Sequence, residues 1–288
     1  MTDASAAPAE PLVVVADHER VRVLTLNRTD AANAFNRALY DAVADALNEA
    51  ADDDAISVVV ITGAGRVFSA GADVKIMARA AAGDAAGTPS DGPSHAPEPA
   101  DPSDSLSAGF DAFLPALSTF PKPLLAAVNG AAVGIGVTML LHCDIVLLSD
   151  RARLRLSFTA MGAVPEAGST VLLPRLVGRQ RSAELLFTSE WVDAARAVEI
   201  GLALAVHPAD SFMSEALDLA ARIAAHPLPS LVATKRLLLE AEPDPVDAAI
   251  VRELAALGGV LRLPGARGRV LDQITKPGSG ETAPSSER

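Results

Sequence analysis

The hydrophobic and polar positions in the first part of the chain follow strand and helix periods in turn. Residues 12–17 and 21–27 are apolar, β-branched runs separated by a polar turn, which is typical of a hairpin. Residues 36–53 place apolar side chains three and four positions apart, which predicts an amphipathic helix. Residues 56–65 form a continuous apolar run ending in glycines, so we expect a strand covered on both faces.

The alternation of strand and helix patterns continues through the middle of the chain. We expect a helix over 110–121, a strand over 122–130, a helix over 132–143, and strands over 144–150 and 152–158. This alternation favours an α/β core. Beyond residue 167 every pattern is helical. The expected helices lie in 167–178, 179–189, 193–201, 211–226, 229–241 and 245–262.

Composition shifts divide the chain into four parts. We expect a disordered leader over 1–10, a core over 11–205, a helical region over 206–275 and a disordered tail over 276–288. Residues 81–108 are rich in Pro, Gly, Ser, Asp and Ala and carry few large apolar side chains, so we expect a mobile insertion in the core. This insertion is either a lid or a neutral surface segment.

Composition and charge exclude several function classes. Of 288 residues, 50% are hydrophobic and only 3% aromatic, so small aliphatic side chains must fill the core. The net charge of −12, without a basic block, argues against nucleic acid and anionic membranes as partners. The apolar stretch 123–148 is long enough to span a membrane, but Asn129, His142 and Asp144 interrupt it, so we expect buried elements there. One cysteine, Cys143, excludes an intrachain disulfide and fits a cytoplasmic protein.

Two turns built from small residues precede predicted helices. The first lies in 68–75, where a loop becomes a helix near Asp73, and the second lies in 128–138. Free backbone N–H groups at a helix start favour negative charge, and small residues let a ligand approach the main chain. Two such groups that converge would form an oxyanion hole, although either turn alone is also common as a purely structural feature.

Four segments in this order, 26–36, 68–77, 122–154 and 162–178, resemble the crotonase superfamily, which is the enoyl-CoA hydratase/isomerase family. The resemblance implies an α/β fold: a crotonase-like spiral of β-β-α units with a C-terminal helical trimerisation region. It also implies an acyl-CoA substrate and a homotrimer or hexamer. Coenzyme A is then part of the substrate, and neither a metal nor a redox cofactor is expected.

The same resemblance implies a set of site residues. The backbone N–H groups of Ala72 and Ile135 match the oxyanion-hole pair, and an N–H donor needs no particular side chain. Further positions are expected to contact the substrate. They are Ala34, Ala70, Gly71, Asp73, Val74, Lys75, Thr138 and Phe158.

The carboxylates of the family's hydratases are missing from this chain. Their two glutamates match Thr138 and Phe158 here, whereas hydration needs groups that deprotonate a water and protonate the α-carbon. Glu166 instead lies in a Pro-Glu-Ala-Gly turn that resembles the Δ3,Δ2-enoyl-CoA isomerase branch, where one glutamate is the only base. One carboxylate is enough to move a proton from C2 to C4. Hydration through Glu166, thioester hydrolysis and acyl-CoA binding without catalysis remain as alternatives.

Glu166 also has a purely structural interpretation. Pro165 and Glu166 at the start of an apolar helix would suit the helix dipole. A catalytic base would instead benefit from an apolar wall that raises its pKa, and Phe158, Met161 and Val164 are candidates for that wall.

The remaining polar residues have weaker claims. We expect His142 and Cys143 to be packing residues rather than a base and a nucleophile, and Asp144 to cap the junction between helix and strand. We expect Asp73 to cap its own helix, and Ser69 has no acid or histidine at a recognisable spacing. Three basic residues are candidates either for the coenzyme A phosphates or for solvated surface positions: Lys75, Arg79 and Lys235.

Overall fold

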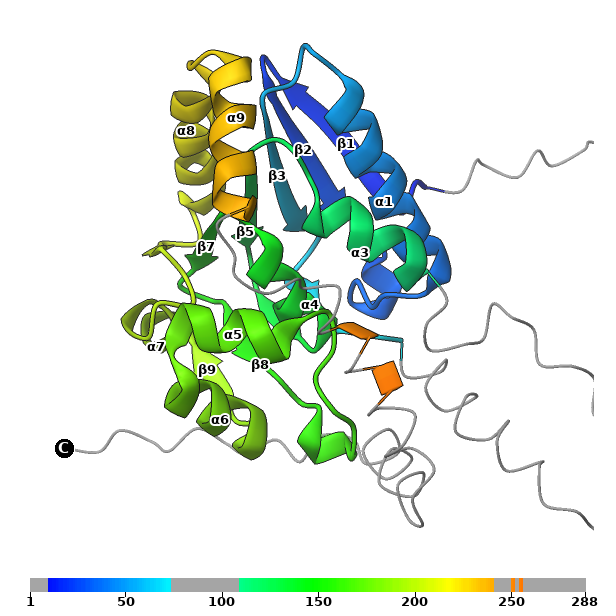
Figure 1. Ribbon diagram of the computed structural model, residues 1–288, viewed down its shortest axis with the longest axis vertical. Helices are drawn as coiled ribbons and strands as arrows, with labels where there is room; N and C mark the ends of the chain where they lie inside the picture. The colour runs from blue at the N-terminus through cyan, green and yellow to red at the C-terminus, as the bar shows by residue number, and fades with distance from the viewer. Residues whose placement is uncertain (1–9, 74–108, 241–249, 252–253, 256–288) are drawn as a thin grey trace, which may run out of the picture.

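The computed structural model describes residues 10–73, 109–240, 250–251 and 254–255, and it places helices around two sheets (Figure 1). The strands are β1 (Val13–His18), β2 (Val21–Leu26), β3 (Val58–Gly63), β4 (Val67–Ser69), β5 (Leu124–Val128), β6 (Ala131–Val133), β7 (Ile145–Ser149), β8 (Arg153–Arg155), β9 (Trp191–Asp193) and β10 (Ala205–His207). The helices are α1 (Arg37–Asp52), α3 (Phe110–Ser118), α4 (Ile135–Thr138), α5 (Ser169–Val177), α6 (Arg179–Thr188), α7 (Ala194–Glu199), α8 (Phe212–Ala224) and α9 (Leu228–Glu240). Short 3-10 segments are η1 (Thr29–Ala31), η4 (Met139–His142) and η5 (Thr159–Met161).

Three successive turns of the chain each contribute one strand to each sheet. The larger sheet has the order β1-β2-β3-β5-β7-β10, and the smaller has the order β4-β6-β8-β9. β4, β6 and β8 follow β3, β5 and β7 along the chain, and they pair in parallel in the same sequence. The hairpin of β1 and β2 is antiparallel. This repeated β-β-α path confirms the α/β spiral predicted from the sequence.

The larger sheet is covered on both faces. Val58 and Val60 of β3 belong to the cluster that packs on α8, whereas Val59 and Ile61 belong to the larger cluster that includes α1 and α3. All six residues of β3 are buried, which confirms the prediction made from its continuous apolar run.

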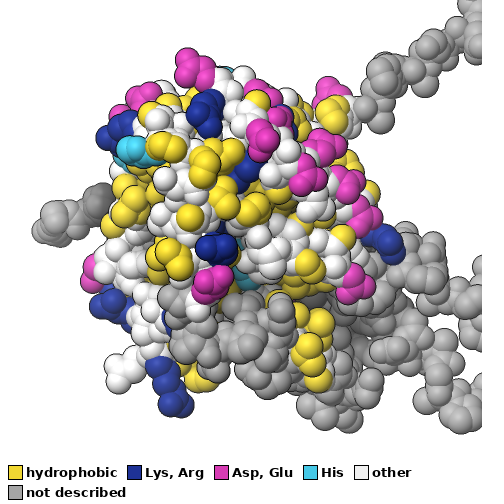
Figure 2. All heavy atoms as spheres, turned by 45° about the horizontal axis from the view of Figure 1, so that its top comes forward, with side chains coloured by type: hydrophobic (Ala, Val, Ile, Leu, Met, Phe, Trp, Pro, Cys, Tyr) yellow, Lys and Arg dark blue, Asp and Glu magenta, His cyan; other side chains and the backbone are white. Residues whose placement is uncertain are grey.

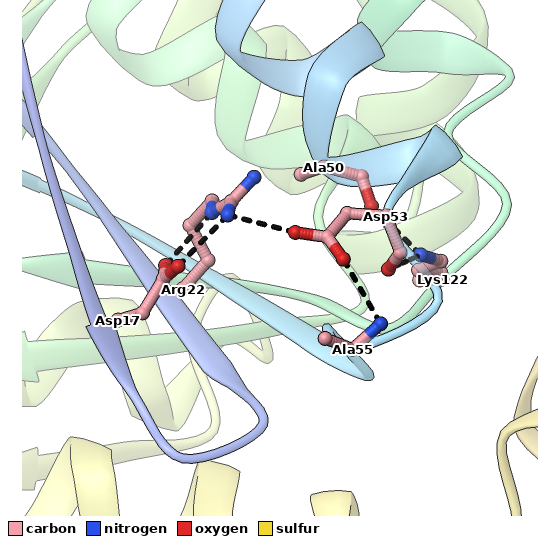
Figure 3. Close-up of polar contacts among 6 residues, drawn as sticks. All are labelled: Asp17, Arg22, Ala50, Asp53, Ala55 and Lys122. Atoms are coloured by element: carbon pink, nitrogen blue, oxygen red, sulfur yellow. Dashed lines mark hydrogen bonds and ion pairs between the residues drawn. The ribbon is translucent and has the colours of Figure 1, made fainter.

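Polar contacts fix both ends of α1. The Asn36 side chain accepts a 2.9 Å hydrogen bond from the Leu39 N–H at the first turn. At the other end, the buried Lys122 ammonium donates to the carbonyls of Ala50 and Asp53 at 2.7 and 2.8 Å (Figure 3). A cation there complements the negative end of the helix dipole, although burial lowers the pKa of Lys122.

Arg22 connects the hairpin to the same corner of the molecule. Its guanidinium bonds the Asp17 carboxylate at 2.8 Å and the Asp53 carboxylate at 3.0 Å (Figure 3). The hydrogen bond from Arg22 lowers the pKa of Asp17. These contacts connect the C-terminal end of α1 to the hairpin.

Two predictions about secondary structure were wrong. The helix expected over 132–143 begins instead with β6, continues as the single turn of α4 and ends as the 3-10 segment η4. The region beyond residue 167, predicted to be all helical, contains β9 and β10. Strands of three residues are too short to show a period, and their pairing partners are far away in the sequence.

Several predictions fall on residues outside the described part of the chain. They are the leader up to residue 9, the insertion 81–108, the tail, the helix expected to start near Asp73 and most of the helix expected over 245–262, of which residues 250–251 and 254–255 are described and helical. The limits of the predicted core and helical region stay a prediction. Within the described ranges, no helix combines the length and the apolar character needed to cross a membrane.

Candidate active site

The first small-residue turn is attached to the loop that precedes α1. The Phe35 N–H donates to the Gly71 carbonyl at 2.7 Å, and the Asp73 N–H donates to the Phe35 carbonyl at 2.8 Å. Phe35 and Ala72 therefore form a parallel bridge. In this pattern the bonds use the neighbours of Ala72, so the Ala72 N–H points away from Phe35.

A set of polar contacts holds this turn in place. The Arg28 guanidinium pairs with the Asp73 carboxylate at 2.7 Å and donates to the Ala34 carbonyl at 2.9 Å. The Asn33 side-chain amide donates to the Val67 carbonyl at 2.8 Å. Arg28 and Asn33 were not singled out from the sequence, and only the fold brings them to the turn. The expected cap role of Asp73 stays a prediction, because the helix lies outside the described residues.

Ser69 also supports the backbone of this turn. Its hydroxyl donates to the Asn33 carbonyl at 2.9 Å and accepts from the Gly71 N–H at 3.2 Å. These contacts give Ser69 a structural role.

The two small-residue turns pack directly against each other. A Cβ atom on Gly71, whose φ is +93°, would lie 2.8 Å from the Val133 carbonyl oxygen. A Cβ atom on Gly136 would lie 2.9 Å from the Ser69 Cβ atom. Only glycine allows this approach at both positions, so the glycines bring the Ala72 and Ile135 segments together.

The role of the Ala72 and Ile135 amides as an oxyanion hole stays a prediction. Ile135 is the first residue of α4, where the N–H has no partner inside the helix. Within the described ranges, neither N–H donates to a backbone carbonyl.

Glu166 precedes α5 rather than beginning it. The helix starts at Ser169 with Gly168 as its N-cap, and its first turn contains no acidic residue. The helix-dipole interpretation of Glu166 is therefore wrong. The half-buried Glu166 accepts a 2.8 Å hydrogen bond from the Thr138 hydroxyl at Oε1. Thr138 ends the one-turn helix that Ile135 begins, so the two residues are separated by about 4.5 Å of helix rise.

The other predicted substrate contacts have different surroundings. Phe158 is buried and belongs to the same core cluster as Leu140 and Ala167, so its part in a wall around Glu166 stays a prediction. Ala34 is buried and Ala70 is exposed. Val74 and Lys75 lie outside the described residues, as does Arg79.

Tyr40 is a polar residue near Glu166 that sequence reasoning missed. Its ring lies 4.8 Å from that of Phe35, 4.9 Å from that of Phe110 and 5.1 Å from that of Phe113, measured between centroids. Among the described residues, its buried hydroxyl has no hydrogen-bond partner. Burial and the Glu166 carboxylate raise the pKa of Tyr40 well above its usual value. A tyrosine on the buried face of an amphipathic helix was the only sequence signal for this position.

His142 contacts the Ala167 carbonyl in the turn that carries Glu166, and Cys143 is the next residue along the chain. Burial lowers the pKa of His142, with the Lys235 charge acting in the same direction, and burial raises the pKa of Cys143 to about 12. A thiol with so high a pKa is a poor nucleophile, which agrees with a packing role for Cys143.

Two predictions about charged residues are corrected here. The Lys235 side chain is only 4% exposed and pairs with the Asp144 carboxylate at 2.6 Å, so it does not reach a surface phosphate. Asp144 also accepts the Leu124 N–H at 2.8 Å, while Cys143 occupies the cap position of η4. Asp144 therefore joins β5, β7 and α9 and is not a helix cap. Both corrections come from a contact between residues 91 positions apart.

The described ranges contain no group of three or more His, Cys, Asp or Glu side chains placed to hold a metal ion.

This fold and site define the crotonase class of proteins. The family model of enoyl-CoA hydratase/isomerase matches residues 17–254, and the chain belongs to that family. Among solved structures, an enoyl-CoA hydratase/isomerase from Pseudoalteromonas atlantica T6c is 33% identical with a TM-score of 0.78, over 91% of this chain and 96% of that one. OdaA from Pseudomonas aeruginosa is 32% identical with a TM-score of 0.78, over 93% and 100%.

Two relatives from Escherichia coli K12 carry specific names. The chain is 36% identical to a 2,3-dehydroadipyl-CoA hydratase, over 84% of this chain and 87% of that protein. It is 32% identical to a 1,2-epoxyphenylacetyl-CoA isomerase, over 80% and 82%. The similarity therefore extends to relatives named for both kinds of reaction.

Proposed function

We propose that this protein is an acyl-CoA isomerase that moves a double bond from C3 to C2, with Glu166 as its only base. The observation that carries this proposal is the Glu166 carboxylate held by Thr138 within one helical turn of the Ile135 amide. The residues at the two hydratase carboxylate positions, Thr138 and Phe158, cannot act as acid or base.

The proposed reaction balances with one carboxylate. Glu166 takes a proton from C2 of a 3-enoyl thioester, and the electron pair of that C–H bond moves into the thioester. The resulting dienolate carries negative charge on the thioester oxygen, which the Ala72 and Ile135 N–H groups bind. Protonated Glu166 then returns the proton at C4, and the double bond is left between C2 and C3. Loss of one oxyanion-hole donor typically raises such a barrier by about 3 to 4 kcal/mol.

The test uses purified protein and a 3-enoyl-CoA, with formation of the conjugated 2-enoyl thioester followed by its ultraviolet absorbance. Glu166→Gln keeps the size of the side chain and removes the base, so we expect turnover to fall about 100-fold or more. Full turnover in this variant would show that Glu166 is not the base.

The same preparation separates the alternatives. Hydration, suggested by the name of the hydratase relative, would consume crotonyl-CoA and water and would remove the enoyl absorbance. Thioester hydrolysis would release free coenzyme A, which a thiol reagent detects. Tight binding of acyl-CoA without any product would indicate a binding protein. We expect isomerisation to be the fastest of these activities.

We also propose a homotrimer or hexamer. Hydrophobic side chains gather in the middle of the face shown in Figure 2, and α9 exposes three successive leucines, Leu237, Leu238 and Leu239. Apolar side chains exposed next to one another favour a protein contact. Light scattering after size-exclusion chromatography measures the mass directly, and a monomer at micromolar concentration would contradict this proposal.

A further inference from the structure

His142 contacts the backbone immediately after the proposed base. Its Nε2 lies 2.8 Å from the carbonyl oxygen of Ala167. A carbonyl oxygen can only accept a hydrogen bond, so the imidazole donates through Nε2–H. Burial lowers the pKa of His142, and the Lys235 charge acts in the same direction, while the hydrogen bond to Ala167 partly offsets them.

The backbone that His142 holds is in an unfavourable conformation. Ala167 has a φ of +57° and Gly168 has a φ of +71°, so two successive residues are left-handed. Glycine adopts this conformation without cost, whereas alanine does not. A contact that fixes the Ala167 carbonyl therefore opposes relaxation of the turn that carries Glu166.

Thr138 and His142 act on Glu166 from the same segment of chain. Thr138 ends α4, and His142 ends η4, which follows without a break. Thr138 holds the carboxylate, and His142 holds the backbone of the next residue. The side chain and the main chain of the turn are thus fixed at two points by one helical segment.

An ion pair between Lys235 and Asp144 lies at the end of this segment. The Lys235 ammonium bonds both oxygens of Asp144 at 2.6 and 2.7 Å, and Asp144 follows His142 by two residues. Asp144 also accepts the Leu124 N–H. The residues beside His142 are therefore tied to a central strand.

We propose that His142 is a positioning residue, which holds the Ala167 carbonyl and thereby keeps the Glu166 carboxylate at the reacting carbon. This proposal rests on the proposed role of Glu166 as the base. His142 itself neither touches the substrate nor transfers a proton. Its contribution is to the geometry of proton transfer, and misplacement of a reacting group by about 1 Å can cost on the order of 100-fold in rate.

The test compares two variants of matched length, His142→Gln and His142→Met. Glutamine offers an amide donor in the place of Nε2, whereas methionine has no donor. We expect His142→Met to lose kcat by about 10- to 100-fold with KM changed by less than about threefold, and His142→Gln to keep most of kcat. Equal rates for the two variants, or an effect on KM alone, would overturn the proposal.

A second variant tests the backbone directly. Ala167→Gly removes the cost of the left-handed conformation, so in the His142→Met background it should restore part of kcat. Absence of any restoration counts against the proposal. If His142→Met does not fold, His142→Asn replaces it, because the shorter amide cannot reach the carbonyl and should be slower than His142→Gln.

The same assays include Glu166→Gln. If Glu166→Gln is inactive and His142→Met is fully active, the positioning role is wrong while the proposed base stands. If Glu166→Gln is fully active, the proposed base itself is wrong.

Discussion

The Thr138 hydroxyl donates a 2.8 Å hydrogen bond to Oε1 of Glu166, although 28 positions separate the two residues. By the resemblance described above, Thr138 matches one of the glutamates of the family's hydratases, and it is completely buried. In the proposed reaction, this hydrogen bond orients the carboxylate that moves the proton.

Removal of this hydroxyl should slow the reaction without preventing folding. For Thr138→Val, which keeps the branched shape, we expect kcat to fall about tenfold, equivalent to about 1.4 kcal/mol in the barrier. Thr138→Ser retains the hydroxyl, so its kcat should stay within about threefold of that of the unchanged protein. Steady-state kinetics with a 3-enoyl-CoA measures both, and equal rates for the two variants would remove Thr138 from the mechanism.

Removal of the Ile135 N–H should affect the transition state more strongly than substrate binding. Proline is tolerated at the first position of a helix, so Ile135→Pro deletes this donor where the helix does not use it. We expect kcat to fall about 100- to 1,000-fold. Ile135→Leu is the control for the buried side chain. Circular dichroism must show that the proline variant is folded, and a folded, fully active proline variant would exclude this amide from the oxyanion hole.

Tyr40 should be replaceable by phenylalanine without loss of stability. Its buried hydroxyl lacks a partner among the described residues, and an unsatisfied polar group destabilises the folded state. We expect Tyr40→Phe to raise the free energy of unfolding by about 1 kcal/mol. Urea denaturation followed by circular dichroism tests this. A clear loss of stability would mean that the hydroxyl has a partner in the folded protein.

The half-buried imidazole of His142 should make the folded protein sensitive to acid. Its pKa is lowered from the usual value of 6.5, so below that value the unfolded chain binds a proton that the folded chain does not. Stability is then complete above pH 6.5 and falls as the pH drops toward the folded-state pKa. Urea midpoints at pH 7.5 and pH 5.5 should differ more for the original chain than for His142→Gln. An equal difference in both proteins would contradict this prediction.

The thiol of Cys143 should be unreactive in the folded protein. Its pKa of about 12 leaves almost no thiolate near neutral pH. A disulfide reagent added at pH 8 should therefore label the chain only in denaturant. Labelling of the native protein at the rate of a free thiol would be inconsistent with this environment. An unreactive Cys143 also lets the same reagent report coenzyme A release without background.

The local elements of the fold were predictable from the sequence, because each depends on a pattern within its own segment. The period of residues 36–53 identified α1, and the continuous run around Val58–Gly63 identified a strand covered on both faces. The small residues around Gly71 and Gly136 identified the two turns. The structure shows the reason for these residues, because a Cβ atom at either glycine would lie too close to the other turn. Glu166 was singled out because the turn that contains it resembles that of one branch of the family, and its role as the base stays a prediction.

Tertiary structure decided what surrounds these elements. The short strands β6, β9 and β10 exist because neighbours in the sheets pair with them, and three residues carry no period of their own. Thr138 reaches Glu166, and Lys235 reaches Asp144, only because separate turns of the spiral stack on each other. The sequence by itself determined which groups were available for chemistry. The packing of distant segments decided which of them meet, because hydrogen bonds and ion pairs act over a few ångströms of space whatever the separation along the chain.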